Sequence, residues 1–177
     1  MYFVLGLEHT GKYIRWAKAK YPNTVVEQVP HWNLTYILRS GMFCVRNHKV
    51  KLLKLSDIEK AIRLKYNVDY VFYGMKKADG MNRRLMLNTY TNCEDKGKVF
   101  PLANWTQKDV IEYMRLRNLP EPVRYSKNAS GGVGFNLDCF LWLRENYPDD
   151  LCKILKVFPM SEKILYDYDY QTNKKTA

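Results

Sequence analysis

Closely spaced metal ligands are missing from this sequence of 177 residues. It has three histidines and four cysteines, and no two of the cysteines form a C-x-x-C pair. Structural zinc sites are built from such pairs, so the sequence argues against a zinc protein and we assign no metal ligands. We expect reduced, mostly structural thiols, with Cys139 and Cys152 on core-facing positions of helices.

Long apolar runs are missing as well. No stretch approaches the roughly 20 apolar residues that a membrane-spanning helix needs. The first residues lack the basic segment and small-residue cleavage site of a signal peptide. We therefore expect a cytoplasmic protein that makes no membrane contact.

Acidic residues are few relative to basic ones. Asp and Glu number 18 against 29 Lys and Arg, which gives a formal net charge of +11. This excess favours acidic partners such as nucleic acid, nucleotides or a negatively charged assembly. Hydrophobic residues make up 46% of the chain, enough for one domain with a real core. We expect that domain over residues 1–165 and a loosely held tail over residues 166–177, where periodicity is absent.

The distribution of apolar residues predicts alternating strands and helices. The first strand, helix and second strand form a βαβ unit, whose strands are expected to be parallel. A capping box is predicted at Ser56 and Glu59, and Thr106 is predicted to cap a helix with Asp109 in its first turn. The predicted elements are strands at 2–7, 24–29 and 70–73, and helices at 12–21, 34–38, from 57 and 107, at 137–147 and from 148.

The segment Gly6 to Tyr13 nearly spells the phosphate-binding pattern G-x-x-x-x-G-K-[ST]. Tyr13 replaces the hydroxyl residue that should hold Mg²⁺, and Glu8 would place a negative charge beside the phosphates. These two differences argue against a working nucleotide loop. We still expect a weak anion contact at the start of the helix, made by His9, Thr10, Gly11 and Lys12. One functional hypothesis is therefore an ATP-binding domain that works through this segment, and two others are given below. The later glycine-rich loop, Ser130 to Gly134, is more simply a connector.

A second cluster of cations follows the strand at Tyr70–Tyr73, which has the apolar content of a buried strand. After Gly74 the side chains of Lys76, Lys77, Arg83 and Arg84 surround one acid, Asp79. In open α/β sheets, ligands bind outside the carboxyl ends of strands. The loop therefore indicates a phosphate or sulfate site, although a solvated basic turn would have the same composition.

Two segments together resemble the phosphoadenosine phosphosulfate (PAPS) reductase branch of the PP-loop ATP pyrophosphatases. Gly74-Met75-Lys76-Lys77-Ala78-Asp79-Gly80-Met81-Asn82-Arg83-Arg84 looks like the family's G-x-[RK]-x-x-[DE]-S-x-x-R-R, with glycine in place of serine. Pro101-Leu102-Ala103-Asn104-Trp105-Thr106-Gln107-Lys108-Asp109-Val110 is similar to its P-L-x-x-W-[ST]-x-x-D-V. Leu119-Pro120 matches the L-P that follows.

The resemblance implies an α/β fold, a three-layer parallel sheet with helices on both faces, as in adenine-nucleotide alpha hydrolases. It implies that Gly74, Lys76, Lys77, Asp79, Arg83 and Arg84 bind phosphate or sulfate of ATP or PAPS. The family's S-G-G-K-D-S loop and its C-terminal cysteine motif have no counterpart in the sequence. We therefore expect a fold truncated at its N-terminal β-loop-α unit, and we assign no catalytic residue.

Two further uses of such a chain follow from this resemblance. It could be the larger part of a split nucleotide or sulfonucleotide enzyme, completed by a partner chain that carries the PP-loop. Alternatively, it could be a catalytically dead member reused as a basic module that binds nucleic acid or a macromolecular assembly. Reduced chains of this kind fit a phage or mobile element, and the location would then be the host cytoplasm.

Overall fold

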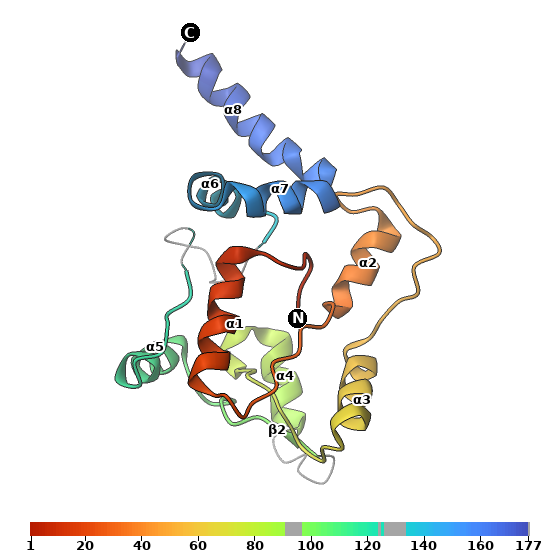
Figure 1. The fold of residues 1–177 in the computed structure, drawn as a ribbon, viewed down its shortest axis with the longest axis vertical. Helices are drawn as coiled ribbons and strands as arrows, with labels where there is room; N and C mark the ends of the chain where they lie inside the picture. Colours follow the sequence, from red (N-terminus) through yellow and green to blue (C-terminus); the bar gives the residue numbers. More distant parts are fainter. Residues whose placement is uncertain (91–96, 124, 126–133, 177) are drawn as a thin grey trace. The chain divides into compact units, whose positions relative to one another are not determined.

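The computed structural model describes residues 1–90, 97–123, 125 and 134–176. They form an α/β structure of helices with a small parallel sheet (Figure 1). The chain divides into two compact units, residues 1–54 with 122–177, and residues 55–121. We call the first the helical unit and the second the sheet unit.

The helical unit contains α1 (Glu8–Lys20), α2 (Trp32–Ser40), α6 (Leu137–Asn146), α7 (Pro148–Val157), the 3-10 turn η3 (Pro159–Glu162) and α8 (Lys163–Thr176). The sheet unit contains α3 (Leu55–Tyr66), β1 (Val71–Phe72), the 3-10 turn η1 (Lys77–Asp79), α4 (Met81–Tyr90), β2 (Lys98–Val99) and α5 (Gln107–Leu116).

The core of the helical unit lies where α6 and α7 pack together. Phe140, Leu143 and Phe158 are almost fully buried, and residues from α2 and α8 join the same cluster. The predicted helices at 137–147 and from Pro148 are confirmed, and Pro148 begins α7 at a position where its missing N–H costs nothing. Cys139 is buried as predicted, but Cys152 is exposed, so its core-facing assignment is wrong.

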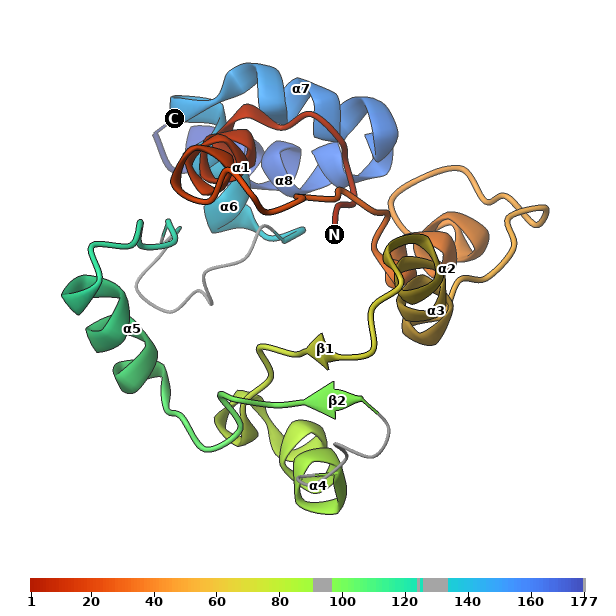
Figure 2. The ribbon, with the colours of Figure 1, turned by 60° about the horizontal axis from the view of Figure 1, so that its bottom comes forward.

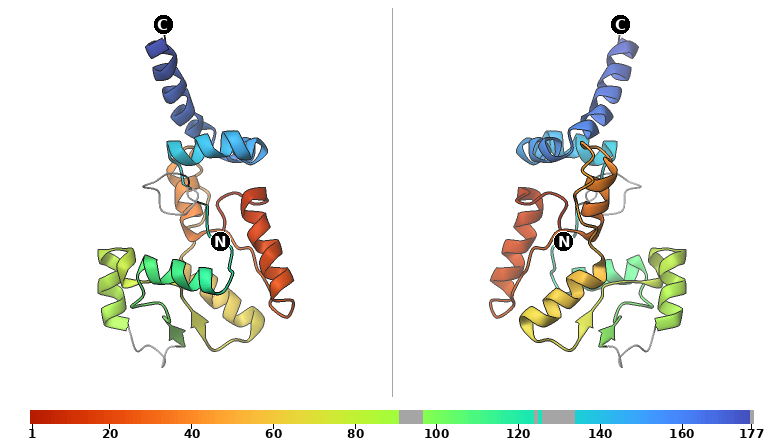
Figure 3. Two further views of the ribbon diagram at one scale, coloured as in Figure 1. Left: turned by 90° about the vertical axis from the view of Figure 1, so that its left-hand side faces the viewer. Right: turned by 90° about the vertical axis from the view of Figure 1, so that its right-hand side faces the viewer.

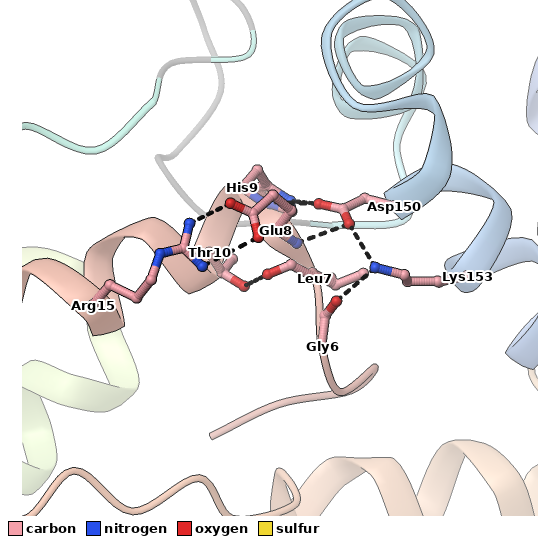
Figure 4. Close-up of polar contacts among 8 residues, drawn as sticks. All are labelled: Gly6, Leu7, Glu8, His9, Thr10, Arg15, Asp150 and Lys153. Carbon is pink, nitrogen blue, oxygen red and sulfur yellow. Dashed lines mark hydrogen bonds and ion pairs between the residues drawn. The ribbon is translucent and has the colours of Figure 1, made fainter.

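Helix α1 begins four residues earlier than predicted because a carboxylate from α7 caps it. Asp150 accepts hydrogen bonds from the backbone N–H groups of Glu8 (2.8 Å) and His9 (2.9 Å). The His9 ring lies 2.9 Å from the same carboxylate through Nδ1, and Lys153 lies 3.4 Å away (Figure 4). Residues 8–11, which precede the predicted helix at 12–21, therefore form the first turn of α1, whose free N–H groups and positive dipole end favour a negative charge.

These hydrogen bonds, and not solvent, stabilise the ionised form of Asp150. Burial by itself raises the pKa of this carboxyl, since the side chain is 1% exposed. Hydrogen bonds from the backbone of His9 and Glu8, from the His9 ring and from Lys153 outweigh that effect, and the pKa lies below its ordinary value. Asp150 is therefore a charged cap inside the helical unit.

The two strands predicted at the amino end are wrong. Among the described residues, the only pairing in this region is an isolated parallel bridge between Tyr2 and Pro30. Tyr2 N–H donates to Val29 (3.0 Å), and His31 N–H donates to Tyr2 (2.8 Å). The parallel direction was predicted correctly, but Phe3 and its neighbour Val4 pack against the helical core instead of extending a sheet.

Helix α2 is longer than the predicted 34–38 segment. His31 precedes it and accepts a hydrogen bond from the backbone N–H of Asn33 (3.1 Å) through its ring. Gly41 has φ +79° and ends the helix in the left-handed conformation.

Residues 167–176 are helical, although the sequence predicted no regular structure there. Helix α8 runs to Thr176 and extends away from α6 and α7 (Figure 3). Its first turns are anchored by buried Leu165 and by an ion pair between Arg144 and Asp169 (2.9 Å). Only the start of the helix packs on the core, so most of its length lacks the apolar stripe on which the prediction relied.

The sheet unit contains two parallel strands. Val71 pairs with Lys98 and Phe72 with Val99, and the strands lie side by side in Figure 2. The predicted strand at Tyr70–Tyr73 exists in shortened form, but it is not buried, because the Phe72 side chain is 68% exposed.

The two predicted helix caps of the sheet unit differ in outcome. Thr106 caps α5 and forms a capping box with Asp109, as predicted. The box at Ser56 is wrong, because Ser56 lies inside α3 and both oxygens of Glu59 contact other groups.

Most of the predicted glycine-rich loop (residues 130–133) lies outside the described residues, and so does Cys93, in residues 91–96. Within the described ranges, no helix has both the length and the apolar character needed to cross a bilayer.

Replacing Asp150 tests its role as a cap. Asp150→Ala leaves two backbone N–H groups and the His9 ring without their buried partner, so we expect the free energy of unfolding to fall by about 3 kcal/mol. Chemical denaturation followed by circular dichroism measures this loss. Asp149→Ala, at the exposed neighbouring position, serves as the control and should change stability by less than about 0.5 kcal/mol. Equal losses in the two variants would contradict the capping role.

The same pair of variants gives a pH test. Because the pKa of Asp150 is lower in the folded than in the unfolded chain, the unfolded chain takes up the proton first as pH falls. The stabilisation is therefore complete above about pH 5 and decreases below it. The stability difference between wild type and Asp150→Ala should be smaller at pH 3.5 than at pH 7, by up to about 0.7 kcal/mol. A difference that is constant with pH would show that charge on Asp150 is not involved.

Candidate anion site in the sheet unit

The carboxyl ends of β1 and β2 open onto neighbouring loops. Tyr73 N–H donates to Val99 (2.9 Å), which continues the ladder beyond the strands. Further along, Lys77 N–H donates to the carbonyl of Ala103 (2.9 Å). The parallel pairing thus brings the basic loop after β1 beside the loop after β2, and the two segments that carried the family resemblance share one edge.

A partly buried ion cluster fixes this pairing. Glu59 of α3 contacts Arg63 (3.0 Å) on its own helix and Lys98 (3.0 Å) on β2, and its side chain is 10% exposed. The hydroxyl of Tyr73, just after β1, donates to the same carboxylate (2.5 Å). One side chain of α3 therefore holds both strands.

Arg63 extends the cluster to the starts of both strands. Its guanidinium donates to the carbonyl of Asp69, ahead of β1, and to the carbonyl of Gly97 (2.8 Å), ahead of β2. The pair Glu59–Arg63 thus contacts each strand at two points, and a slip of β1 relative to β2 would break several of these contacts at once.

The cluster also shifts two pKa values in opposite directions. Burial raises the pKa of Glu59, but hydrogen bonds from Tyr73, Lys98 and Arg63 outweigh it and the net pKa is lowered. Burial and the hydrogen bond to Glu59 both raise the pKa of Tyr73, so the phenol stays protonated and keeps donating.

Within the basic loop, one of the four cations is already neutralised. The ammonium group of Lys76 lies 2.8 Å from Asp79, and its backbone N–H donates to the same carboxylate (3.1 Å). The hydrogen bond from Lys76 is the largest cause of the lowered pKa of Asp79, and Arg83 contributes through its charge. Asp79 therefore closes the η1 turn and keeps the loop ordered.

The two arginines lie in the first turn of α4. Arg83 and Arg84 are exposed, and neither forms an ion pair with an acid within four ångströms in the described ranges. Lys77 is half-buried and is fixed through its backbone. Among the described residues, Lys77, Arg83 and Arg84 therefore form no ion pair with an acid. They lie at or just before the start of α4, and the dipole of this helix also favours an anion.

Gly80 joins η1 to α4 in a conformation that other residues rarely adopt. Its φ is +151°, and a Cβ atom there would meet no heavy atom within 4 Å. Backbone conformation, rather than lack of space, therefore explains why glycine stands where the resembling pattern has serine.

The second predicted anion contact is at the start of α1, and there the anion is Asp150. Thr10 Oγ donates to the carbonyl of Leu7 (3.1 Å), and Gly11 N–H donates to the same carbonyl (2.9 Å). Lys12 lies over the ring of Tyr147 (5.7 Å). His9 is buried against Asp150. These four residues belong to the helical unit, whereas the basic loop belongs to the sheet unit.

Sequence reasoning missed the residues that position the site. The spacing of Glu59 and Arg63, four residues apart on one helix face, was available as a signal. Nothing local indicated that this pair also contacts Tyr73 and Lys98. Among the described residues, no group of three or more His, Cys, Asp or Glu side chains is arranged to hold a metal ion.

These features define an α/β protein with a basic turn at the carboxyl end of a parallel strand. The sequence matches the model of the phosphoadenosine phosphosulfate reductase domain over residues 9–134. The chain belongs to this family, as the resemblance of its two segments predicted. Comparison of the sequence with curated proteins and with solved structures found no match.

Glu59→Gln tests the ion cluster. The amide keeps the size of the side chain but loses the charge that pairs with Arg63 and Lys98, so we expect a loss of about 2 kcal/mol in unfolding free energy. Glu112→Gln is the matched control, because Glu112 is exposed on α5. Chemical denaturation should leave this control within about 0.5 kcal/mol of wild type. A loss in the control as large as in Glu59→Gln would rule out a specific role for the cluster.

Proposed function

We propose that the chain binds an adenine nucleotide carrying phosphate or phosphosulfate groups, such as PAPS or ATP, through the basic turn of the sheet unit. The observation that supports this proposal most directly is the pairing of β1 with β2. It brings the loop of Lys77 beside the loop of Ala103, so that the two segments resembling the family motifs form one edge. Ligands of open α/β sheets bind at such edges.

Each residue of the turn has a defined part in this proposal. Lys77, Arg83 and Arg84 provide charge for phosphate or sulfate oxygens, and guanidinium groups can contact two oxygens at once. Asp79 fixes Lys76 and orders the turn. Gly74 lies two residues after β1, and Gly80 allows the chain to enter α4 at positive φ.

The proposed enzyme is completed by a second polypeptide. Charged side chains attract an anion, but orienting a phosphate for reaction takes successive backbone N–H groups. The start of α1, which could offer such groups, is capped by Asp150. We propose that a partner chain supplies an S-G-G-K-D-S loop with its strand and helix, so that the small sheet becomes part of a three-layer parallel sheet. The family match supports one domain, because it spans residues of both units.

Calorimetric titration with PAPS, ATP and adenosine 3′,5′-bisphosphate tests the site. Arg83→Ala/Arg84→Ala removes two of the three cations of the turn that form no ion pair among the described residues. We therefore expect at least one of these ligands to bind the double variant at least about tenfold more weakly than it binds wild type. The control, Lys60→Ala/Arg117→Ala, removes the same charge from exposed positions on α3 and after α5, outside both segments that resemble the family motifs. It should keep the affinity within about twofold, because exposed charges outside the site are screened.

Two results would count against the proposal. Equal weakening in both double variants would show that net charge, and not the turn, attracts the nucleotide. Absence of binding both for the chain alone and after addition of a polypeptide carrying S-G-G-K-D-S would remove the nucleotide assignment altogether.

A further inference from the structure

A long segment of the helical unit carries positive charge only. Residues 28–54 contain two arginines and three lysines but no aspartate or glutamate. Average composition would place about three or four acids in a segment of this length. The segment covers α2 and the loop that follows it, and it lies outside the basic turn of the sheet unit.

Helix α2 exposes aromatic rings on the face opposite its core contacts. Trp32 is 41% exposed and Tyr36 is 53% exposed. Together with exposed Arg39 they stand at i, i+4 and i+7, which places all three on one face of the helix. Ile37 is buried in the hydrophobic cluster instead. The two rings are therefore not part of the core.

Hydrogen bonds hold the loop after α2 beside the helix. Asn47 N–H donates to the carbonyl of Leu38 (2.9 Å), and Leu53 N–H donates to the hydroxyl of Thr35 (2.9 Å). Gly41 makes the reversal possible, because a Cβ atom there would lie 2.9 Å from that of Arg46. The loop that carries these cations thus lies beside α2, the helix that carries the exposed rings.

The charges on this surface are available to a ligand. Arg39, Arg46, Lys49 and Lys51 are all exposed. Arg46 donates to the backbone carbonyl of Arg39 (3.4 Å), which neutralises neither charge. None of the four forms an ion pair with an acid in the part of the chain that the structure describes.

We propose that this surface binds single-stranded nucleic acid. We call it the α2 face and define it by Trp32, Tyr36, Arg39, Arg46, Lys49 and Lys51. Single-strand binding surfaces combine cations that follow the phosphates with aromatic rings on which bases stack. A duplex hides the faces of its bases, so the exposed rings favour a single strand. The proposal is independent of nucleotide binding in the sheet unit.

Fluorescence anisotropy with a labelled 20-nucleotide single strand of mixed sequence tests the α2 face in the full chain. Arg46→Ala/Lys49→Ala/Lys51→Ala should weaken binding about tenfold or more near 100 mM salt. With four cations on phosphates, the plot of log Kobs against log salt should have a slope of about −3, which falls to about −1 in this variant. Tyr36→Ala should weaken binding about tenfold, and Tyr36→Phe should retain it because the stacking ring remains.

Two controls make the result specific. Lys18→Ala/Lys20→Ala/Lys156→Ala removes three exposed charges from α1 and α7 of the same unit and should change the affinity by less than about threefold. Lys60→Ala/Arg117→Ala, which removes two exposed charges from the sheet unit outside the basic turn, should likewise have little effect. The proposal is overturned if the single strand does not bind at low salt, if either control weakens binding as much as the α2-face variant, or if a duplex of the same length binds equally well.

Discussion

The carboxylate of Glu59 links the two strands on which the candidate site depends. It is 10% exposed, and it contacts Arg63 on α3, Lys98 on β2 and the hydroxyl of Tyr73 after β1. Two strands of two residues each form too small a sheet to stand alone. A charge held by three partners supplies the register that so few ladder bonds cannot. The positions of the basic turn and of the loop at Ala103 follow from that register.

The helical unit uses the same physical solution at a different place. Asp150 is buried, carries its charge and satisfies the N–H groups of Glu8 and His9. In both units a carboxylate joins elements that are distant in the sequence, and in both its pKa is lowered because hydrogen bonds outweigh burial. Such groups stabilise only while every partner is present, because an unpaired buried charge is costly.

Positive charge is concentrated on two different surfaces of the chain. The basic turn is compact, begins a helix and includes an acid, Asp79, that orders it. The α2 face is extended, contains no acid and carries exposed rings. The first arrangement fits a small ligand with a few negative oxygens, and the second fits a polymer with regularly spaced phosphates and stackable bases. The formal net charge of +11 does not separate these two surfaces, because it is a sum over the chain.

The sequence by itself determined the family, the helices around Pro148 and Thr106, and the strand that precedes the basic turn. These features depend on local patterns: a proline at the first position of a helix, a capping box and a short apolar run. Only the tertiary structure decided where α1 begins, which residues hold β1 to β2, and that Tyr2 forms a single bridge instead of a strand. Each of these depends on a partner far along the chain, such as Asp150 for His9 or Lys98 for Glu59. A local sequence pattern does not indicate which distant residue will contact a given side chain.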